Sequence, residues 1–152
     1  MKKIRLFIGR LLAWATLPLA IVVLRGSHRT RVMIVSNNKL LVVKTFIHHG
    51  RWSLPGGGVH NGESSFDGAL RELKEETGVT LTRDELTFVG EKPFSSYGVS
   101  TLNTYFLARL PKKTPLMHNF EIIESDWIDI SSINHKTCEK DILEGLSLVR
   151  SL

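Results

Sequence analysis

Two stretches of the chain carry apolar residues at the spacing of an α-helix. Between Ser65 and Thr77 (SFDGALRELKEET) they recur every three or four positions, which predicts one buried stripe. Ser64 or Ser65 can cap the start of this helix, and Gly78 can end it in a left-handed turn. Residues 137–152 repeat the spacing and predict a closing helix. The apolar positions are Phe66, Ala69, Leu70 and Leu73 in the first helix and Ile142, Leu143, Leu146 and Val149 in the second.

The other apolar runs inside the domain are short and typical of β-strands. Asn37 and Asn38 separate two of them and predict the turn of a hairpin. Strands mixed with helices on two faces of the sheet indicate an α/β sandwich. The predicted strands cover residues 32–36, 39–46, 86–90, 101–110 and 122–130, and residues 111–115 form a loop.

The first 28 residues differ from the rest, because a basic start precedes a long apolar run. Residues 6–24 are apolar apart from Arg10, with Pro18 inside them, and a basic segment follows. The uninterrupted part, Leu11–Leu24, has 14 residues, short of the ~20 that a helix needs to span a bilayer. Three interpretations stay open. The segment is a helix that docks on the domain or lies in a membrane interface, a single membrane anchor, or a cleaved signal peptide, although no small-x-small cleavage site follows it.

Length and composition indicate one domain, which we place at residues 29–152, after the segment 1–28. A hydrophobic content of 42% can support a core. The single cysteine, Cys138, excludes an internal disulfide framework and fits a reducing compartment.

Positive charge is concentrated before Glu63, the first acidic residue. Ten Lys and Arg precede it, and ten more share the rest of the chain with all 15 acids. The first part therefore carries +10 and the rest −5, which gives the net charge of +5. A basic half suits a polyanionic substrate, and it also suits an anionic membrane surface. Because no basic patch interleaved with aromatic residues is present, we expect no specific nucleic-acid binding.

Three glutamates of the first predicted helix form a candidate metal site. Glu72, Glu75 and Glu76 stand at i, i+3 and i+4, so their carboxylates share one edge of the helix. Such a run is usually a solvated face, but acids this close repel one another unless a cation lies among them. A hard divalent cation fits, and Mg²⁺ suits a phosphate substrate. Arg71 can pair with Glu75, and the backbone carbonyl of Gly56 in the upstream turn SLPGGG can supply another ligand.

The same helix belongs to a longer pattern that runs from Gly57 to Val79. The segment GGVHNGESSFDGALRELKEETGV reads G-x5-E-x7-R-E-U-x-E-E-x-G-U, where U is a bulky aliphatic residue. It fills all nine fixed positions without a gap, with Gly57, Glu63, Arg71, Glu72, Leu73, Glu75, Glu76, Gly78 and Val79. The segment therefore closely resembles the Nudix box of the Nudix hydrolases.

This resemblance implies a fold, an activity and a cofactor. The fold is the Nudix α/β/α sandwich with a mixed sheet, covering about residues 29–152 and preceded here by the N-terminal apolar helix. Members of the family mostly hydrolyse a nucleoside diphosphate linked to another group, using magnesium, and Mn²⁺ is an alternative metal. For this chain the resemblance implies hydrolysis of a phosphoanhydride bond in a nucleoside triphosphate, an ADP-sugar or a similar diphosphate. Glu72, Glu75 and Glu76 would hold the metal.

Residues outside the pattern are candidates for the general base and for substrate binding. In the family the base lies in the box or in a later loop, and here Glu121 or Glu124 can take the later place. Three aromatic residues are candidates for stacking on a base, although we expect at least one of them to pack in the core. They are Trp52, Phe46 and Tyr105.

Two classes of function follow. The first is a Mg²⁺-dependent hydrolase of nucleotides or other small diphosphates. The second is a non-catalytic nucleotide-binding sensor or interaction module, which residues 1–28 could tether to a membrane surface. The complete glutamate set favours the enzyme, because a pure binding module has no chemical need for it. Nucleotide substrates also favour a cytoplasmic location. The basic residues on both sides of the apolar run favour membrane association through residues 1–28.

Overall fold

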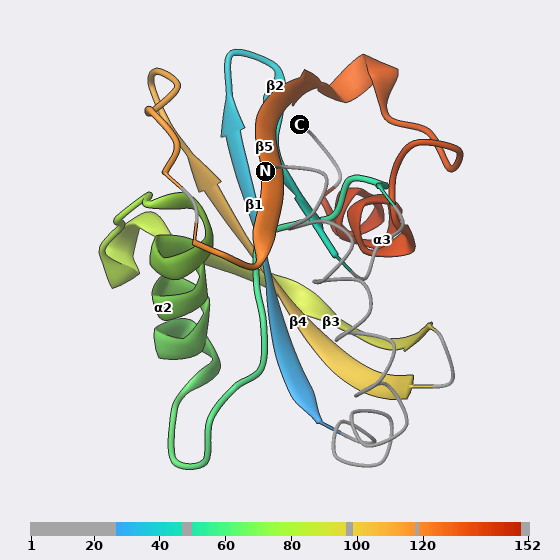
Figure 1. Cartoon of the computed structure of the whole chain (residues 1–152). Helices are drawn as coiled ribbons and strands as arrows, with labels where there is room; N and C mark the ends of the chain where they lie inside the picture. The colour runs from blue at the N-terminus through green and yellow to red at the C-terminus, as the bar shows by residue number, and fades with distance from the viewer. Residues whose placement is uncertain (1–26, 47–49, 97–98, 118, 150–152) are drawn as a thin grey trace.

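In the computed structural model, which describes residues 27–46, 50–96, 99–117 and 119–149, the chain forms one five-stranded mixed sheet (Figure 1). The strand order is β3-β4-β1-β2-β5; β1 and β4 are parallel, and the other neighbours are antiparallel. The strands are β1 (His28–Ser36), β2 (Lys39–Thr45), β3 (Thr87–Ser96), β4 (Val99–Arg109) and β5 (Ile122–Asp129). The helices are α2 (Ser65–Thr77) and α3 (Lys140–Leu148), with short 3₁₀ turns η1 (Arg83–Glu85) and η2 (Ile130–Ser132).

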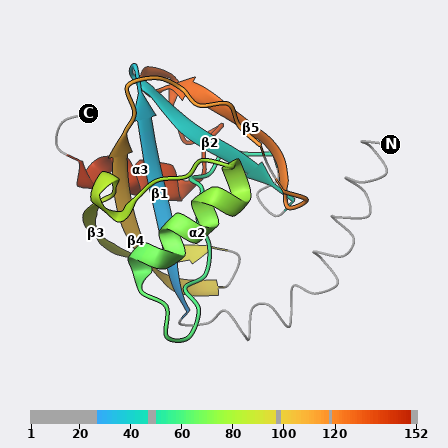
Figure 2. The same ribbon diagram turned by 90° about the vertical axis from the view of Figure 1, so that its left-hand side faces the viewer.

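One α-helix covers each face of the sheet, as Figures 1 and 2 show. Alternate residues of β1 face opposite sides, as the pleat of a strand requires. Val32 and Ile34 pack in the cluster that contains α2, whereas Met33 and Val35 pack in the cluster that contains α3. The predicted α/β sandwich with a mixed sheet is therefore confirmed for the described residues.

Helix α2 has the bounds and caps that its sequence predicts. The Ser64 hydroxyl accepts a hydrogen bond from the Asp67 N–H at 3.1 Å, which satisfies one of the free donors at the helix start. Gly78 ends the helix with φ of 73°, and its N–H donates to the Lys74 carbonyl. These caps fix where the acidic edge of α2 begins and ends.

The loop before α2 enters the sheet between β1 and β2. The two strands pair only beside their turn, at Asn37 and Asn38, whose positive φ values suit the hairpin. Beyond it, Ser53 pairs with β2 through Val43, and the next residues pair with β1. The N–H groups of Val32 and Thr30 donate to the carbonyls of Pro55 and Gly57 at 2.9 and 2.8 Å. The glycine turn is therefore held by the sheet on one side of α2.

Three elements differ from the predicted bounds by three residues or more. Strand β1 begins at His28, not at residue 32, because residues 28–31 pair with β4. The closing helix begins at Lys140, not at residue 137, because the residues before it run beside Trp52, whose carbonyl accepts the Glu139 N–H at 2.6 Å. The predicted strand 86–90 continues to Ser96, since β3 lies at the edge of the sheet, where Pro93 costs no shared hydrogen bond.

The N-terminal apolar segment is predicted at residues 1–28, and residues 1–26 lie outside the described part of the chain. Neither α-helix in the described part has the length and apolarity of a membrane span.

Candidate functional site

Two glycines allow the loop before α2 to lie against both β1 and the acidic edge of the helix. A side chain at Gly56, where φ is 139°, would collide with the Thr30 carbonyl. A side chain at Gly57 would collide with the carboxylate of Glu72, which packs directly on that glycine. Glycine therefore lets the backbone approach β1 at residue 56 and the Glu72 carboxylate at residue 57.

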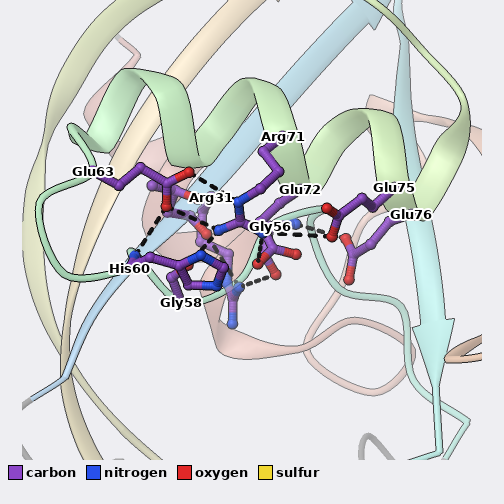
Figure 3. A network of polar contacts seen from close by, with 10 residues as sticks. Arg31, Gly56, Gly58, His60, Glu63, Arg71, Glu72, Glu75 and Glu76 are labelled. Atoms are coloured by element: carbon purple, nitrogen blue, oxygen red, sulfur yellow. Dashed lines mark hydrogen bonds and ion pairs between the residues drawn. The ribbon is translucent and has the colours of Figure 1, made fainter.

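Arg71 is the centre of the polar network in Figure 3. Its guanidinium donates to both carboxylate oxygens of Glu63 at 2.9 and 3.0 Å, to Glu72 Oε1 at 2.9 Å and to the Gly58 carbonyl at 2.9 Å. The predicted contact with Glu75 is present at 3.5 Å, but it is the longest of these. The main partner of Arg71 is therefore Glu63, which spacing along a helix does not indicate.

Glu63 is held as an ionised carboxylate. Hydrogen bonds from Arg71, with a further one from the His60 N–H, lower the pKa of Glu63 to about 2. The same hydrogen bonds, which Arg71 donates to Glu63, raise the pKa of Arg71. The Glu63–Arg71 pair ties the loop before α2 to the middle of the helix. It also fixes the Arg71 side chain beside Glu72.

Glu76 has the opposite environment. Its carboxylate is buried and accepts a hydrogen bond from the Gly56 N–H at 2.8 Å, and no ion pair involving it occurs in the described part of the chain. The pKa of Glu76 is raised to about 8, mainly by burial and to a smaller extent by the negative charges of Glu72 and Glu121, against the lowering effect of the Gly56 N–H and of Arg31. A carboxylate in this state binds a proton or a cation readily.

Two arginines of β1 belong to the site, and neither is part of the predicted set. Buried Arg31 donates from Nη1 to the Gly56 carbonyl at 2.8 Å and forms an ion pair with buried Asp141 of α3 at 3.1 Å. The pKa of Arg29 is lowered to about 10, mainly by burial and then by the positive charge of Arg31. The one available sequence signal is a charged residue at the start of the apolar run RVMIV.

Of the two later acids, Glu121 is the one whose charge reaches the helix edge. It is exposed, its charge acts on the pKa of Glu76 as described, and the Asn119 side chain accepts the N–H of Glu121 at 2.9 Å. Glu124 instead pairs with Lys44 across β2 and β5 at 2.9 Å. The geometry therefore separates two candidates that the sequence leaves equal.

The three candidate aromatic residues have different surroundings. The half-buried Phe46 ring lies 5.7 Å from the exposed ring of Phe120, while Lys44 covers one face of Trp52 at 3.9 Å from its centroid. Tyr105 is fully buried, and its hydroxyl donates to Glu144 at 3.1 Å. Tyr105 is therefore the one of the three that packs in the core, as expected of at least one of them, and it is not a stacking residue because no face of its ring reaches solvent.

The acidic edge has the donor chemistry of a hard-cation site without a preformed metal geometry. Carboxylates and a backbone carbonyl are the ligands that Mg²⁺ prefers. Among the described residues, however, no group of three His, Cys, Asp or Glu side chains is close enough to hold an ion as it stands. The guanidinium of Arg71 contacts one oxygen of Glu72 at 2.9 Å and one oxygen of Glu75 at 3.5 Å, which leaves the second oxygen of each carboxylate for an ion.

Comparison with known proteins places most of the described region in one family. The family model described as NUDIX domain matches residues 26–146. The chain is 30% identical over 118 residues to Nudix hydrolase 10 of Arabidopsis thaliana, an alignment that covers 76% of this chain and 41% of that protein. The chain spans less than half the length of the first curated relatives it matches.

Solved structures show the same fold at low sequence identity. A MutT NUDIX hydrolase from Burkholderia pseudomallei superposes with a TM-score of 0.71 at 21% identity, covering 82% of this chain and 98% of that one. The NUDIX domain of NrtR from Shewanella oneidensis, solved with ADP ribose, superposes with a TM-score of 0.70 at 17% identity, covering 82% and 86%.

Proposed function

The chain belongs to the Nudix family, and from this premise we propose that it hydrolyses a phosphoanhydride bond in a nucleoside diphosphate linked to another group. The observation that carries this proposal is Glu76, a buried carboxylate on the edge it shares with Glu72 and Glu75, bonded to the backbone of the glycine turn. A solvated helix face would leave this carboxylate in water. Its burial favours a bound cation as its partner.

We propose that Glu72, Glu75, Glu76 and the Gly56 carbonyl hold Mg²⁺, for which Mn²⁺ can substitute. A metal bound there would neutralise charge on the phosphate oxygens and favour attack by water. Arg71 positions Glu72 and competes with the metal for Glu75. Glu75 has the longer contact with Arg71 and the most exposed side chain of the three, so it can change its orientation most easily on metal binding.

Glu121 is the proposed general base. It is exposed and close enough to Glu76 for their charges to interact, so its carboxylate can receive a proton from a water near the acidic edge. Glu124 is the weaker candidate because Lys44 neutralises it. Replacing Glu121 with Gln should therefore lower kcat more than replacing Glu124.

The substrate is proposed to be a nucleotide derivative whose base lies near the Phe46 ring. That ring and Phe120 form an aromatic pair beside Glu121, whereas Lys44 already covers one face of Trp52. Adenine-containing diphosphates come first in a substrate panel, since a structural relative was solved with ADP ribose. Nucleoside triphosphates, ADP-sugars, dinucleoside polyphosphates and non-nucleotide diphosphates complete it.

The test is turnover of this panel with Mg²⁺ or Mn²⁺, measuring orthophosphate and pyrophosphate release separately and identifying the nucleotide product. We expect hydrolysis of at least one nucleoside diphosphate derivative, abolished by chelation and by Glu76→Gln. Nucleotide that binds with the metal and is recovered unchanged would contradict the hydrolase and support the non-catalytic sensor.

A further inference from the structure

We propose that Arg31 and Asp141 form a buried positioning pair that aims the Gly56 carbonyl at the metal site. The C-terminal helix α3 would thereby help to set metal affinity from the opposite face of the sheet. This inference rests on the proposed function, because it assumes that the Gly56 carbonyl is a metal ligand.

The Gly56 peptide is exceptional within the glycine turn. The carbonyls on either side of it, at Pro55 and Gly57, both accept hydrogen bonds from N–H groups of β1. The Gly56 N–H donates to Glu76, and its own carbonyl accepts from Arg31 Nη1 at 2.8 Å. Gly56 has φ of 139° and no Cβ, so no side chain of its own limits the direction of its carbonyl. Arg31 is the side chain that contacts this carbonyl directly, and it therefore helps to fix its direction.

Asp141 holds Arg31 in place. Its Oδ2 lies 3.1 Å from Arg31 Nε, accepts the Ser53 hydroxyl at 2.6 Å and accepts the Leu54 N–H at 3.2 Å. Asp141 is 1% exposed and Arg31 is 5% exposed, so water competes with neither contact. One carboxylate of α3 thus anchors both the arginine and the start of the turn that contains Gly56.

A purely structural role is a weak reason to bury this pair. Removing two charges from water costs about as much as their attraction returns, and apolar residues of similar volume often serve stability equally well. Arginine supplies something that apolar residues cannot, a planar group that contacts a carboxylate at one edge and a carbonyl at another. Both contacts are present here, which is the arrangement expected of a residue that orients a ligand.

The experiment compares three single variants in the full-length protein. Arg31→Lys keeps the positive charge and loses the planar group, so a changed metal affinity reports geometry and not charge. Asp141→Asn keeps an oxygen for Ser53 and Leu54 and removes the charge. Arg51→Lys is the matched control, because Arg51 ties the same turn region to the start of α3 through the Cys138 carbonyl and Glu139 without touching Gly56.

Mn²⁺ binding is measured without substrate, by the loss of the electron paramagnetic resonance signal of free Mn²⁺. Thermal melting, kcat and KM for one panel substrate are measured in parallel. We expect the Mn²⁺ dissociation constant to rise by about tenfold or more in Arg31→Lys and Asp141→Asn, as for other residues that orient a metal ligand. We expect kcat at fixed metal to fall while the substrate KM stays near the wild-type value, and Arg51→Lys to bind Mn²⁺ normally even if it melts earlier.

The proposal is overturned if Arg31→Lys binds Mn²⁺ as tightly as the wild type or more tightly. It is also overturned if Arg51→Lys weakens Mn²⁺ binding as much as Arg31→Lys does. If Arg31→Lys does not fold, Asp141→Asn decides by the same criteria. Wild-type protein that binds no Mn²⁺ would instead contradict the proposed metal site itself, so the two failures are distinguishable.

Discussion

The two ends of α2 hold glutamates of one motif in opposite electrostatic states. Glu63, just before the helix, accepts hydrogen bonds from Arg71 that lower its pKa to about 2. Glu76, in the last turn, is deprived of water by burial that raises its pKa to about 8, and its one strong donor is a backbone N–H. Residue type is identical, so the difference comes from the burial of Glu76 and from the arginine partner of Glu63.

The difference divides the motif into a framework part and a reactive part. The charge of Glu63 is neutralised by Arg71, which donates to both carboxylate oxygens, so Glu63 needs no metal ion. We therefore assign Glu63 the role of holding the loop against α2. The ionised form of Glu76 is compensated incompletely by the protein, which is why its pKa is raised, and a perturbed pKa is a common property of functional sites. Glu72 and Glu75 lie between these extremes, because Arg71 contacts both, at 2.9 and 3.5 Å.

The strongest test of this division compares Glu76→Gln with Glu63→Gln. We expect Glu76→Gln to lower turnover by at least ~100-fold with the fold intact, because a lost ligand removes charge stabilisation of several kcal/mol. Glu63→Gln should lose less activity and more thermal stability, since it leaves the Arg71 guanidinium without its main partner. Turnover is measured at limiting Mg²⁺, with circular dichroism as the control for folding. Wild-type turnover in Glu76→Gln would remove it from the metal site.

Much of this arrangement could be predicted from the sequence because it is local. The bounds of α2 follow from Ser64, Gly78 and an apolar stripe that all lie within one helix length. The hairpin turn at residues 37–38 is equally local. The box pattern brings the three glutamates to one edge without any knowledge of the sheet.

The long-range partners could not be predicted. Arg71 has Glu75 at helical spacing, but the loop before α2 returns and supplies Glu63, a contact that depends on where the chain enters the sheet. Arg31 and Asp141 meet only because β1 and α3 pack together. Strand alternation likewise did not reveal that Tyr105 is fully buried, since depth depends on what covers each face.

A second test targets the cation that joins the two ends. Arg71→Ala should lower both activity and melting temperature, because Glu72 and Glu63 lose the group that orients them. We expect a loss of roughly tenfold or more in kcat/KM, as for other residues that orient metal ligands. Arg71→Lys should restore only part of it, since a point charge cannot reach Glu63 with two parallel hydrogen bonds. Complete restoration by Lys would show that charge, and not the planar geometry, is what the site requires.

The smallest expected effect is the pH dependence of stability in the metal-free protein, and it tests both ends of α2 at once. The folded state keeps a proton on Glu76 up to pH about 8, whereas an unfolded glutamate loses it near its ordinary pKa of 4.5. Between these values the folded state binds more protons, so the free energy of unfolding falls as pH rises and levels off above about 8.

Glu63 acts in the opposite sense. Its folded pKa of about 2 lies below the ordinary 4.5, so its stabilisation is complete above pH 4.5 and is lost as pH falls toward 2. Melting is followed from pH 3 to 9 in the presence of a chelator. We expect Glu76→Gln to melt several degrees above wild type at pH 8.5 and to lose the alkaline decline, with about 2–4 °C expected per kcal/mol. Glu63→Gln should flatten only the acid limb. If Glu76→Gln still loses stability at alkaline pH, the loss belongs to another titrating group. The proposed difference between the two glutamates would then be wrong.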